Sequence, residues 1–240
     1  MQTRVFDGFV PDQVMSSMWP SPTFHFEICE TSKDQQVLHF AERSLIEGAN
    51  LKRQQDFCSG RYCAHRILDK LGYREVPVLS DPYGAPCWPA DIVGSISHSG
   101  GMAMAVAAYQ QHVRTLGFDI QAYERPFPYD TLDMLFRPEE KQSILSIAPE
   151  LMDLYAYSIF SAKESVFKCC YSAFGCLLEW CDIAITLDWV KGIFVARTPQ
   201  HPICESFFDN SGLTGSIFID NSCIYTGIWL SAAPYTRSNG

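Results

Sequence analysis

Residues 160–168 read FSAKESVFK, and they decide how the rest of this chain is interpreted. Two shorter segments precede them: residues 94–99 read GSISHS, and residues 117–121 read GFDIQ. Together the three segments supply a small-residue loop with a histidine, a carboxylate on a short strand, and a Glu/Lys pair one helical turn apart. These groups are the ones needed to hold a diphosphate, a divalent cation and an attacking hydroxyl in one place.

Glu164 and Lys168 lie four residues apart, so in a helix they project from one face. The plain interpretation is an i,i+4 salt bridge on the surface. Against it, the surrounding residues are apolar: Phe160, Ala162, Val166, Phe167 and Cys170. A charged pair among them is either partly buried or faces a cleft. Lys163 projects about 100° away around the helix, and we expect it at the edge of the same site as a cofactor-binding residue.

Asp119 follows a short apolar run, so it sits at or near the end of a strand. Its side chain shares a face with Gly117 and Gln121, because side chains alternate along a strand. The glycine leaves room for a bulky group to approach the backbone. Mg²⁺ often takes only one or two carboxylates, completed by substrate phosphates and water. Asp119 with Glu164 would meet that requirement, and the plain alternative is an acid that ends a strand at a turn.

The segment 94–101 concentrates glycine, serine and one histidine, His98, in eight residues. Its composition predicts a loop. Small residues allow backbone N–H groups to approach phosphate oxygens, and His98 could donate a further hydrogen bond. An ordinary Gly/Ser turn is the alternative. A serine hydrolase is disfavoured, because the segment contains no Gly-x-Ser-x-Gly elbow.

Composition places the 240-residue chain among globular proteins, with 47% hydrophobic and 19% charged residues. The sequence has no apolar run long enough for a transmembrane helix, and its first residues lack the apolar core of a secretory signal. We therefore expect a cytoplasmic protein without membrane association. Ten cysteines occur without a Cys-x-x-Cys pair, which favours reduced, packed thiols over disulfides or structural zinc.

The net charge of −9 argues against a nucleic-acid partner. Between residues 52 and 74, however, the chain carries a basic strip of Lys52, Arg53, Arg61, Arg66, Lys70 and Arg74. Such a strip suits a small polyanion better than a duplex, and a solvated helix face is the alternative.

Periodicity predicts helices at about 51–71, ended by Gly72, and at about 152–171, with a further helix starting at Pro138. The last sixty residues predict a β-meander at 183–187, 193–197, 213–220 and 223–230, preceded by a strand at 113–120. Residues 102–108 fit a buried strand or a helix, and residues 1–35 read as irregular. Each half offers one long helix and several strands, so two similar α+β halves are allowed.

Read together, the segments resemble the larger, Sfp- and EntD-like class of 4′-phosphopantetheinyl transferases. The resemblance runs from about residue 53 to residue 171. It includes Ser59–Ala64 (SGRYCA), residues 84–89 (GAPCWP), the Ser-His segment, Gly-x-Asp, and the Lys-Glu-Ser-x-x-x-Lys helix. The Trp-Pro pair before the Ser-His segment is similar to the EntD-like branch.

The resemblance implies an α+β pseudo-dimer of two similar halves, which we place at residues 1–115 and 116–240, with the site between them. It implies transfer of the phosphopantetheine arm of coenzyme A to a serine of an acyl, peptidyl or aryl carrier protein, releasing 3′,5′-ADP with Mg²⁺ as cofactor. Two halves in one chain favour a monomer. Relatives serve secondary metabolism, such as siderophore or fatty acid biosynthesis.

The resemblance also implies residue roles. Asp119 and Glu164 would hold Mg²⁺, with Glu164 also the base for the serine hydroxyl. Lys168 would neutralise phosphate charge or assist the leaving group. The expected coenzyme A contacts are Ser97 and His98 at the phosphates, and Arg53 and Arg61 at the 3′-phosphoadenosine end.

Two positions depart from the family pattern. Gln121 stands where a second acid is usual, and we expect it to offer an amide oxygen to the metal without charge. Ala85 stands where some relatives carry a basic residue. The competing hypothesis is a non-catalytic relative that binds coenzyme A or a carrier protein, with Gln121 marking a degraded metal site. An unrelated metal-dependent phosphohydrolase would need more His and Asp ligands than this chain groups together.

Overall fold

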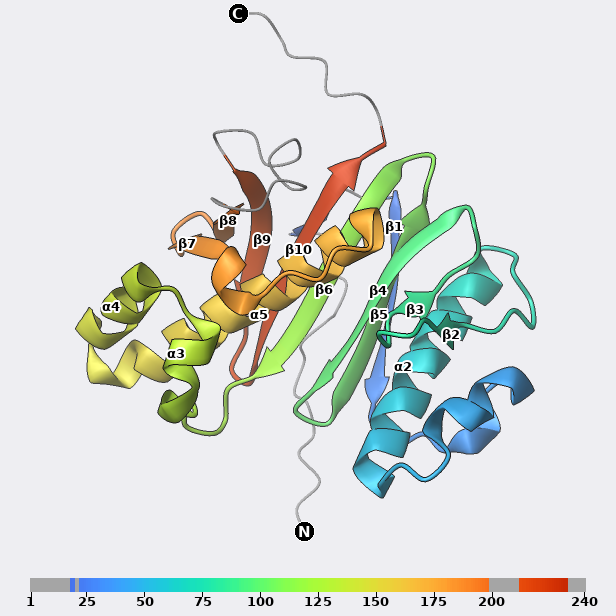
Figure 1. Cartoon of the computed structure of the whole chain (residues 1–240). Helices are drawn as coiled ribbons and strands as arrows, with labels where there is room; N and C mark the ends of the chain where they lie inside the picture. The colour runs from blue at the N-terminus through green and yellow to red at the C-terminus, as the bar shows by residue number, and fades with distance from the viewer. Residues whose placement is uncertain (1–17, 20–21, 199–211, 233–240) are drawn as a thin grey trace, which may run out of the picture.

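Two β-sheets lie beside each other, and one long helix packs against each of them (Figure 1). The structure, a computed structural model, describes residues 18–19, 22–198 and 212–232. The first sheet has the order β1-β5-β4, with β1 Phe24–Glu30, β5 Met102–Tyr109 and β4 Ile92–Ser99. The second has the order β6-β10-β9-β8-β7, with β6 Val113–Ala122, β10 Cys223–Ser231, β9 Leu213–Ile219, β8 Ile193–Arg197 and β7 Ala184–Asp188.

Helix α2, Leu51–Lys70, covers the first sheet, and helix α5, Pro149–Phe174, covers the second. A third apolar cluster joins β4 and β5 to β6 and β10, and therefore holds the two sheets together. The remaining elements are short: η1 Gln35–Val37, η2 Phe40–Ile46, β2 Leu79–Ser80, β3 Pro86–Cys87, η3 Tyr129–Thr131, α3 Leu132–Leu135, α4 Pro138–Ser146 and η4 Trp180–Asp182. No helix in the described part of the chain is both long and apolar enough to cross a membrane.

Both long helices and the C-terminal meander were predicted from the sequence and are confirmed. Gly72 follows α2 with a φ of 90°, the left-handed conformation that ends a helix. The apolar run 102–108 is a strand, because β5 lies in the middle of its sheet between β1 and β4. Residues 1–17, 20 and 21 lie outside the described residues. The irregular reading of residues 1–35 is wrong for β1, whose pairing with β5 supplies order that composition did not reveal.

The predicted Gly/Ser loop at 94–101 is wrong for residues 94–99, which belong to β4, and is confirmed only for Gly100 and Gly101, the turn between β4 and β5. Alternate serines of β4 point at β6, the neighbouring strand of the other sheet, and accept hydrogen bonds from its backbone. The contacts are Phe118 N to Ser95 Oγ at 3.1 Å, Ile120 N to Ser97 Oγ at 3.3 Å, and Ala122 N to Ser99 Oγ at 2.9 Å. This serine ladder joins the two sheets through side chains, so the small polar residues that resemble a loop are needed in a strand.

The two halves repeat one local arrangement around a buried glutamate. In the first half, Glu42 accepts hydrogen bonds from the backbone of His39 and of Val78 and pairs with His65 on α2. In the second half, Glu140 accepts from the backbone of Arg137 and of Ile185 and pairs with Lys163 on α5. Each glutamate precedes its helix partner by 23 residues. The chain therefore contains two similar α+β halves, although no sequence repeat is visible.

The same correspondence shows why one half carries the candidate site. A constant offset of 98 residues relates Glu42 to Glu140 and His65 to Lys163. At that offset Lys70 corresponds to Lys168, but Arg66 stands in the place of Glu164. The first half therefore keeps the lysine and lacks the carboxylate.

Helix α5 packs directly on the backbone of β6. Thr115 Oγ1 donates to the carbonyl of Cys169 at 2.8 Å, and Asp119 accepts a hydrogen bond from Ser161 at 2.8 Å. Between them, a Cβ atom on Gly117 would lie 1.8 Å from the carbonyl oxygen of Ser165. The glycine therefore sets the distance between the strand that carries Asp119 and the helix that carries Glu164.

Gly117→Ala is expected to destabilise the fold by at least about 3 kcal/mol, because the clash is with helix backbone that cannot rotate away. Urea unfolding measures this free energy. Gly60→Ala is the matched control: a Cβ there meets the Cγ2 methyl of Ile96 at 2.8 Å, a side-chain atom rather than backbone. Equal effects of the two substitutions would contradict the proposed spacing role of Gly117.

Candidate active site

Asp119 is the most enclosed acid of the candidate site, with 4% of its surface exposed. Its Oδ1 accepts from Ser97 Oγ at 2.7 Å and lies 2.7 Å from Lys168 Nζ, while its Oδ2 accepts from Ser161 Oγ at 2.8 Å. The carboxylate is thus held by β4 on one side and α5 on the other. Three donors satisfy the charge that burial would otherwise penalise.

Lys168 and Glu164 lie beside Asp119 on one face of α5. Lys168 Nζ lies 3.8 Å from Glu164 Oε2 and donates to the carbonyl of Phe118 at 3.2 Å. Burial raises the pKa of the Glu164 carboxyl; the Lys168 ammonium lowers it and the Asp119 charge raises it further. A carboxylate with a raised pKa is a better proton acceptor near neutral pH than an exposed one.

His98, at the end of β4, lies in a cationic environment. Burial lowers the pKa of its imidazole, the Asp56 carboxylate opposes this, and Lys168, Arg53 and Lys52 lower the pKa further. The distance from His98 Nδ1 to Asp56 Oδ2 is 3.6 Å. The lowered pKa favours the neutral imidazole, which can donate one hydrogen bond to an anion while Arg53, exposed on the first turn of α2, supplies charge.

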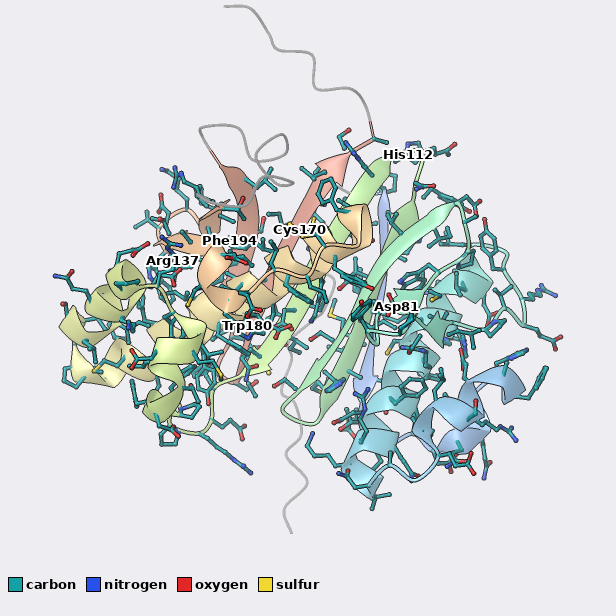
Figure 2. All side chains as sticks on the ribbon, in the orientation of Figure 1. Asp81, His112, Arg137, Cys170, Trp180 and Phe194 are labelled. Atoms are coloured by element: carbon teal, nitrogen blue, oxygen red, sulfur yellow. The ribbon has the colours of Figure 1, made fainter. Side chains whose placement is uncertain are left out.

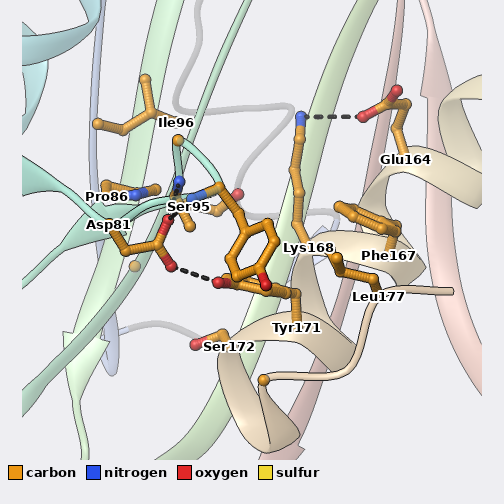
Figure 3. A pocket seen from close by; sticks show the side chains of 15 residues that line it. Asp81, Pro86, Ser95, Ile96, Glu164, Phe167, Lys168, Tyr171, Ser172 and Leu177 are labelled. Atoms are coloured by element: carbon orange, nitrogen blue, oxygen red, sulfur yellow. Dashed lines mark hydrogen bonds and ion pairs between the residues drawn. The ribbon is translucent and has the colours of Figure 1, made fainter.

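A cavity of about 510 Å³ opens beside Glu164 and Lys168 (Figure 3). Its first wall consists of residues 81 and 83–86 with the β4 residues Gly94, Ser95 and Ile96. Its second wall is α5 and the segment after it, including Phe167, Tyr171 and Leu177. The cavity thus lies between the two halves and has the acid and the lysine at one side.

Two predicted site residues are placed elsewhere. Lys163 has no exposed surface; its Nζ lies 2.6 Å from Glu140 Oε2 and donates to the carbonyls of Leu135 and Trp180. The expectation that it binds cofactor is therefore wrong, because it projects into the interior of the second half.

Arg61 is also buried, with 5% of its surface exposed. Its Nε donates to the carbonyl of Val78 at 2.6 Å and its Nη2 to Ser80 Oγ at 2.9 Å. Burial lowers the pKa of the guanidinium to about 10, so it stays charged. The guanidinium holds the segment that leads into the cavity wall. Because its donors are used there, the expectation that Arg61 contacts a terminal phosphate is contradicted.

Gln121 follows Asp119 on the same face of β6, and its Nε2 donates to the carbonyl of Ala122 at 2.8 Å. The Ser97 hydroxyl donates a hydrogen bond to Asp119 and accepts hydrogen bonds from the Ile120 backbone and from Lys168. It therefore positions the acid in this structure. Ser161 is not among the residues predicted from the sequence, although its position three residues before Glu164, on the same helix face, could have indicated it.

The carboxylates of the site fit a cation whose other ligands come from the substrate. Within the described ranges, no group of three or more His, Cys, Asp and Glu side chains is placed to hold a metal ion. Asp119 and Glu164 supply two carboxylates on either side of Lys168. Two carboxylates with substrate phosphates and water are a usual set for Mg²⁺ and an unusual one for zinc.

Family models match both halves of the chain. The model of the 4′-phosphopantetheinyl transferase N-terminal domain matches residues 41–108, and that of the 4′-phosphopantetheinyl transferase superfamily matches residues 115–220. A solved structure, holo-ACP-synthase from Plasmodium yoelii, aligns with a TM-score of 0.40 and 18% identity over 51% of this chain and 98% of that one.

Curated relatives show the same affiliation. The chain is 35% identical to the 4′-phosphopantetheinyl transferase Svp of Streptomyces mobaraensis, over 65% of this chain and 63% of that protein. It is 32% identical to the transferase PptT of Mycobacterium tuberculosis, over 65% and 70% of the two chains. It is 30% identical to enterobactin synthase component D of Escherichia coli K12, over 61% and 69%. With both halves matched in order, and the acid, lysine and cavity at their junction, the chain belongs to the 4′-phosphopantetheinyl transferase family.

Proposed function

We propose that this chain transfers the 4′-phosphopantetheine group of coenzyme A to a serine of an apo carrier protein and releases 3′,5′-ADP. The observation that carries the proposal is the cluster of Asp119, Lys168 and Glu164 beside a cavity shared by the two halves. Both cavity walls come from one chain, which supports a monomer. The protein would act in the cytoplasm.

The residues would divide the work of phosphoryl transfer, which requires positioning and charge neutralisation more than covalent chemistry by the protein. Glu164 would accept the proton of the serine hydroxyl while the serine oxygen bonds to the pantetheine-bearing phosphorus. The bond from that phosphorus to the bridging oxygen breaks, and the bridging oxygen leaves on 3′,5′-ADP. Lys168 would neutralise the diphosphate, and His98 and Arg53 would bind the nucleotide phosphates; their positions beside Glu164 and Asp56 support these roles.

Asp119 and Glu164 would hold Mg²⁺, which when bound neutralises negative charge on the diphosphate. Lys168 keeps the two carboxylates from repelling each other before the substrate arrives, because it lies 2.7 Å from one and 3.8 Å from the other. Gln121 would reach the metal through its amide oxygen or through water.

The test is the intact mass of an apo carrier protein after incubation with this protein, coenzyme A and Mg²⁺, with EDTA added in a parallel reaction. A gain of one phosphopantetheine that EDTA abolishes is the expected result. Measurable coenzyme A binding without any gain, across acyl, peptidyl and aryl carrier proteins, would overturn the proposal in favour of a non-catalytic relative.

Gln121→Glu is expected to lower the Mg²⁺ concentration for half-maximal activity roughly tenfold, about 1.4 kcal/mol, because a carboxylate adds a charged oxygen next to Asp119. A titration of initial rate against Mg²⁺ measures this. Gln142→Glu, the same change on the exposed face of α4, controls for net charge. An unchanged or weaker Mg²⁺ dependence would exclude Gln121 from the metal's surroundings.

A further inference from the structure

A hydrogen bond between two residues that are far apart in the sequence joins the two walls of the cavity. Tyr171, on α5, donates its hydroxyl to Asp81 Oδ2, which belongs to the segment between β2 and β3 (Figure 3). Asp81 comes from the first half and Tyr171 from the second. Both residues line the cavity, together with Glu164 and Lys168. We call this contact the brace.

Asp81 also fixes the shape of its own wall. Its Oδ1 accepts from the backbone N–H groups of Tyr83 and Ala85, each at 2.9 Å, and its carbonyl accepts from Gly84 N at 3.0 Å. These bonds form a tight turn of the kind that aspartate stabilises. One carboxylate thus shapes the turn with one oxygen and ties it to α5 with the other.

Arg61 holds the same wall from behind, because it bonds to the backbone of residues 78 and 79 and to Ser80 immediately before the brace. On the opposite side, the ring of Tyr171 stacks on Phe167, with centroids 6.3 Å apart, and meets Tyr83 edge-on at 6.0 Å. Arg61 therefore supports the Asp81 end of the brace from within the first half, whereas the Tyr171 ring packs on Phe167 of its own half and on Tyr83 of the other.

The brace and the serine ladder join the two halves at different places. The ladder bonds β4 to β6, and the cavity-lining residue Ser95 is part of it. The ladder consists of side-chain-to-backbone bonds, so β4 and β6 share no backbone pairing that would set the spacing of the cavity walls. A contact across the cavity itself is then the direct means of fixing that spacing.

Near neutral pH the brace joins a charged acceptor, Asp81, to a neutral donor, Tyr171. The hydrogen bond to Asp81 is the main cause that raises the pKa of Tyr171 to about 12. Burial alone would raise the pKa of Asp81, but the bonds from Tyr171, Ala85 and Tyr83 lower it. A charged acceptor and a neutral donor give a stronger bond than two neutral groups.

We propose that Tyr171 and Asp81 are positioning residues that fix the spacing of the cavity walls and thereby determine the affinity for coenzyme A. This inference rests on the proposed function only in taking coenzyme A as the occupant. Neither brace side chain bonds to Asp119, Glu164 or Lys168. Loss of the brace therefore removes binding that the ground state and the transition state share, which raises KM and leaves kcat unchanged.

The experiment measures coenzyme A binding by titration calorimetry without carrier protein, and then KM and kcat with carrier protein. Tyr171→Phe keeps the ring and removes the hydroxyl; we expect Kd and KM to rise about tenfold and kcat to stay within about twofold. Asp81→Asn keeps an oxygen acceptor and should lie between wild type and Tyr171→Phe. Tyr129→Phe is the matched control. It also removes a Tyr–Asp hydrogen bond, the 2.7 Å bond from Tyr129 to Asp153, but this bond lies within the second half.

The outcomes separate the two proposals. Wild-type binding of coenzyme A without transfer defeats the proposed function, while the Kd comparison still tests the brace. An unchanged Kd in Tyr171→Phe, or a rise equal to that of Tyr129→Phe, overturns the brace. A fall in kcat with unchanged KM overturns it too, and absence of coenzyme A binding by the wild-type protein overturns both proposals.

Discussion

Glu164→Gln is expected to lower kcat about 10³-fold or more in carrier-protein modification, while the protein stays folded. Removing a positioned base costs about 10² to 10⁴ in rate, and this change also removes one of the two carboxylates beside Lys168. Glutamine has the size of glutamate but accepts no proton. The rate is measured by the mass of the carrier protein under excess coenzyme A and Mg²⁺.

The fold should tolerate this change, because Glu164 is only half-buried and its carboxylate lies 3.8 Å from its lysine partner. Glu150→Gln, on the exposed first turn of the same helix, is the control and should leave kcat unchanged. Near-wild-type activity in Glu164→Gln would remove Glu164 from the mechanism. Loss of activity with a large fall in melting temperature would instead assign it a structural role.

The site acids and the lysine could be found from the sequence because each lies in a regular element with a fixed spacing. Glu164 and Lys168 are four residues apart on a helix, and Gly117 shares a strand face with Asp119, so periodicity alone fixed their directions. The structure adds what spacing could not supply. It brings Asp119 within 2.7 Å of Lys168 by packing β6 on α5.

The predictions that failed depend on long-range partners. A serine-rich strand resembles a loop until its hydroxyls are seen to accept from the backbone of β6. Arg61 and Lys163 have the charge of phosphate ligands, yet one holds the backbone of residues 78 and 79 and the other pairs with Glu140. Asp81 and Tyr171 meet across 90 residues of sequence, a contact that no local pattern indicates.

Lys163 connects four segments of the second half from inside it. Its ammonium lies 2.6 Å from Glu140 on α4 and donates to Leu135 O on α3 and to Trp180 O on η4, each at 2.9 Å. Burial lowers the pKa of Lys163 and the Glu140 carboxylate opposes this. The corresponding residue of the first half, His65, makes the same contact with Glu42. The position is therefore structural in both halves.

Lys163→Met is expected to lower the free energy of unfolding by about 3–5 kcal/mol, because it leaves the charge of Glu140 buried without a partner. Urea unfolding measures this. Lys141 lies on α4, like Glu140, and forms an exposed pair with Asp133 of α3. Lys141→Met should therefore cost less than about 1 kcal/mol. Adding Glu140→Gln to Lys163→Met should cost less than the sum of the two single changes, because the unpaired charge is then absent.

The coenzyme A affinity of folded Lys163→Met separates the structural role from the cofactor role that the sequence suggested. A side chain without exposed surface cannot contact the ligand, so Kd should match that of the wild-type protein at a temperature where both are folded. A Kd raised about tenfold, with little loss of stability, would indicate that Lys163 binds coenzyme A after all. Strict additivity of the two substitutions would show that Lys163 and Glu140 do not stabilise each other.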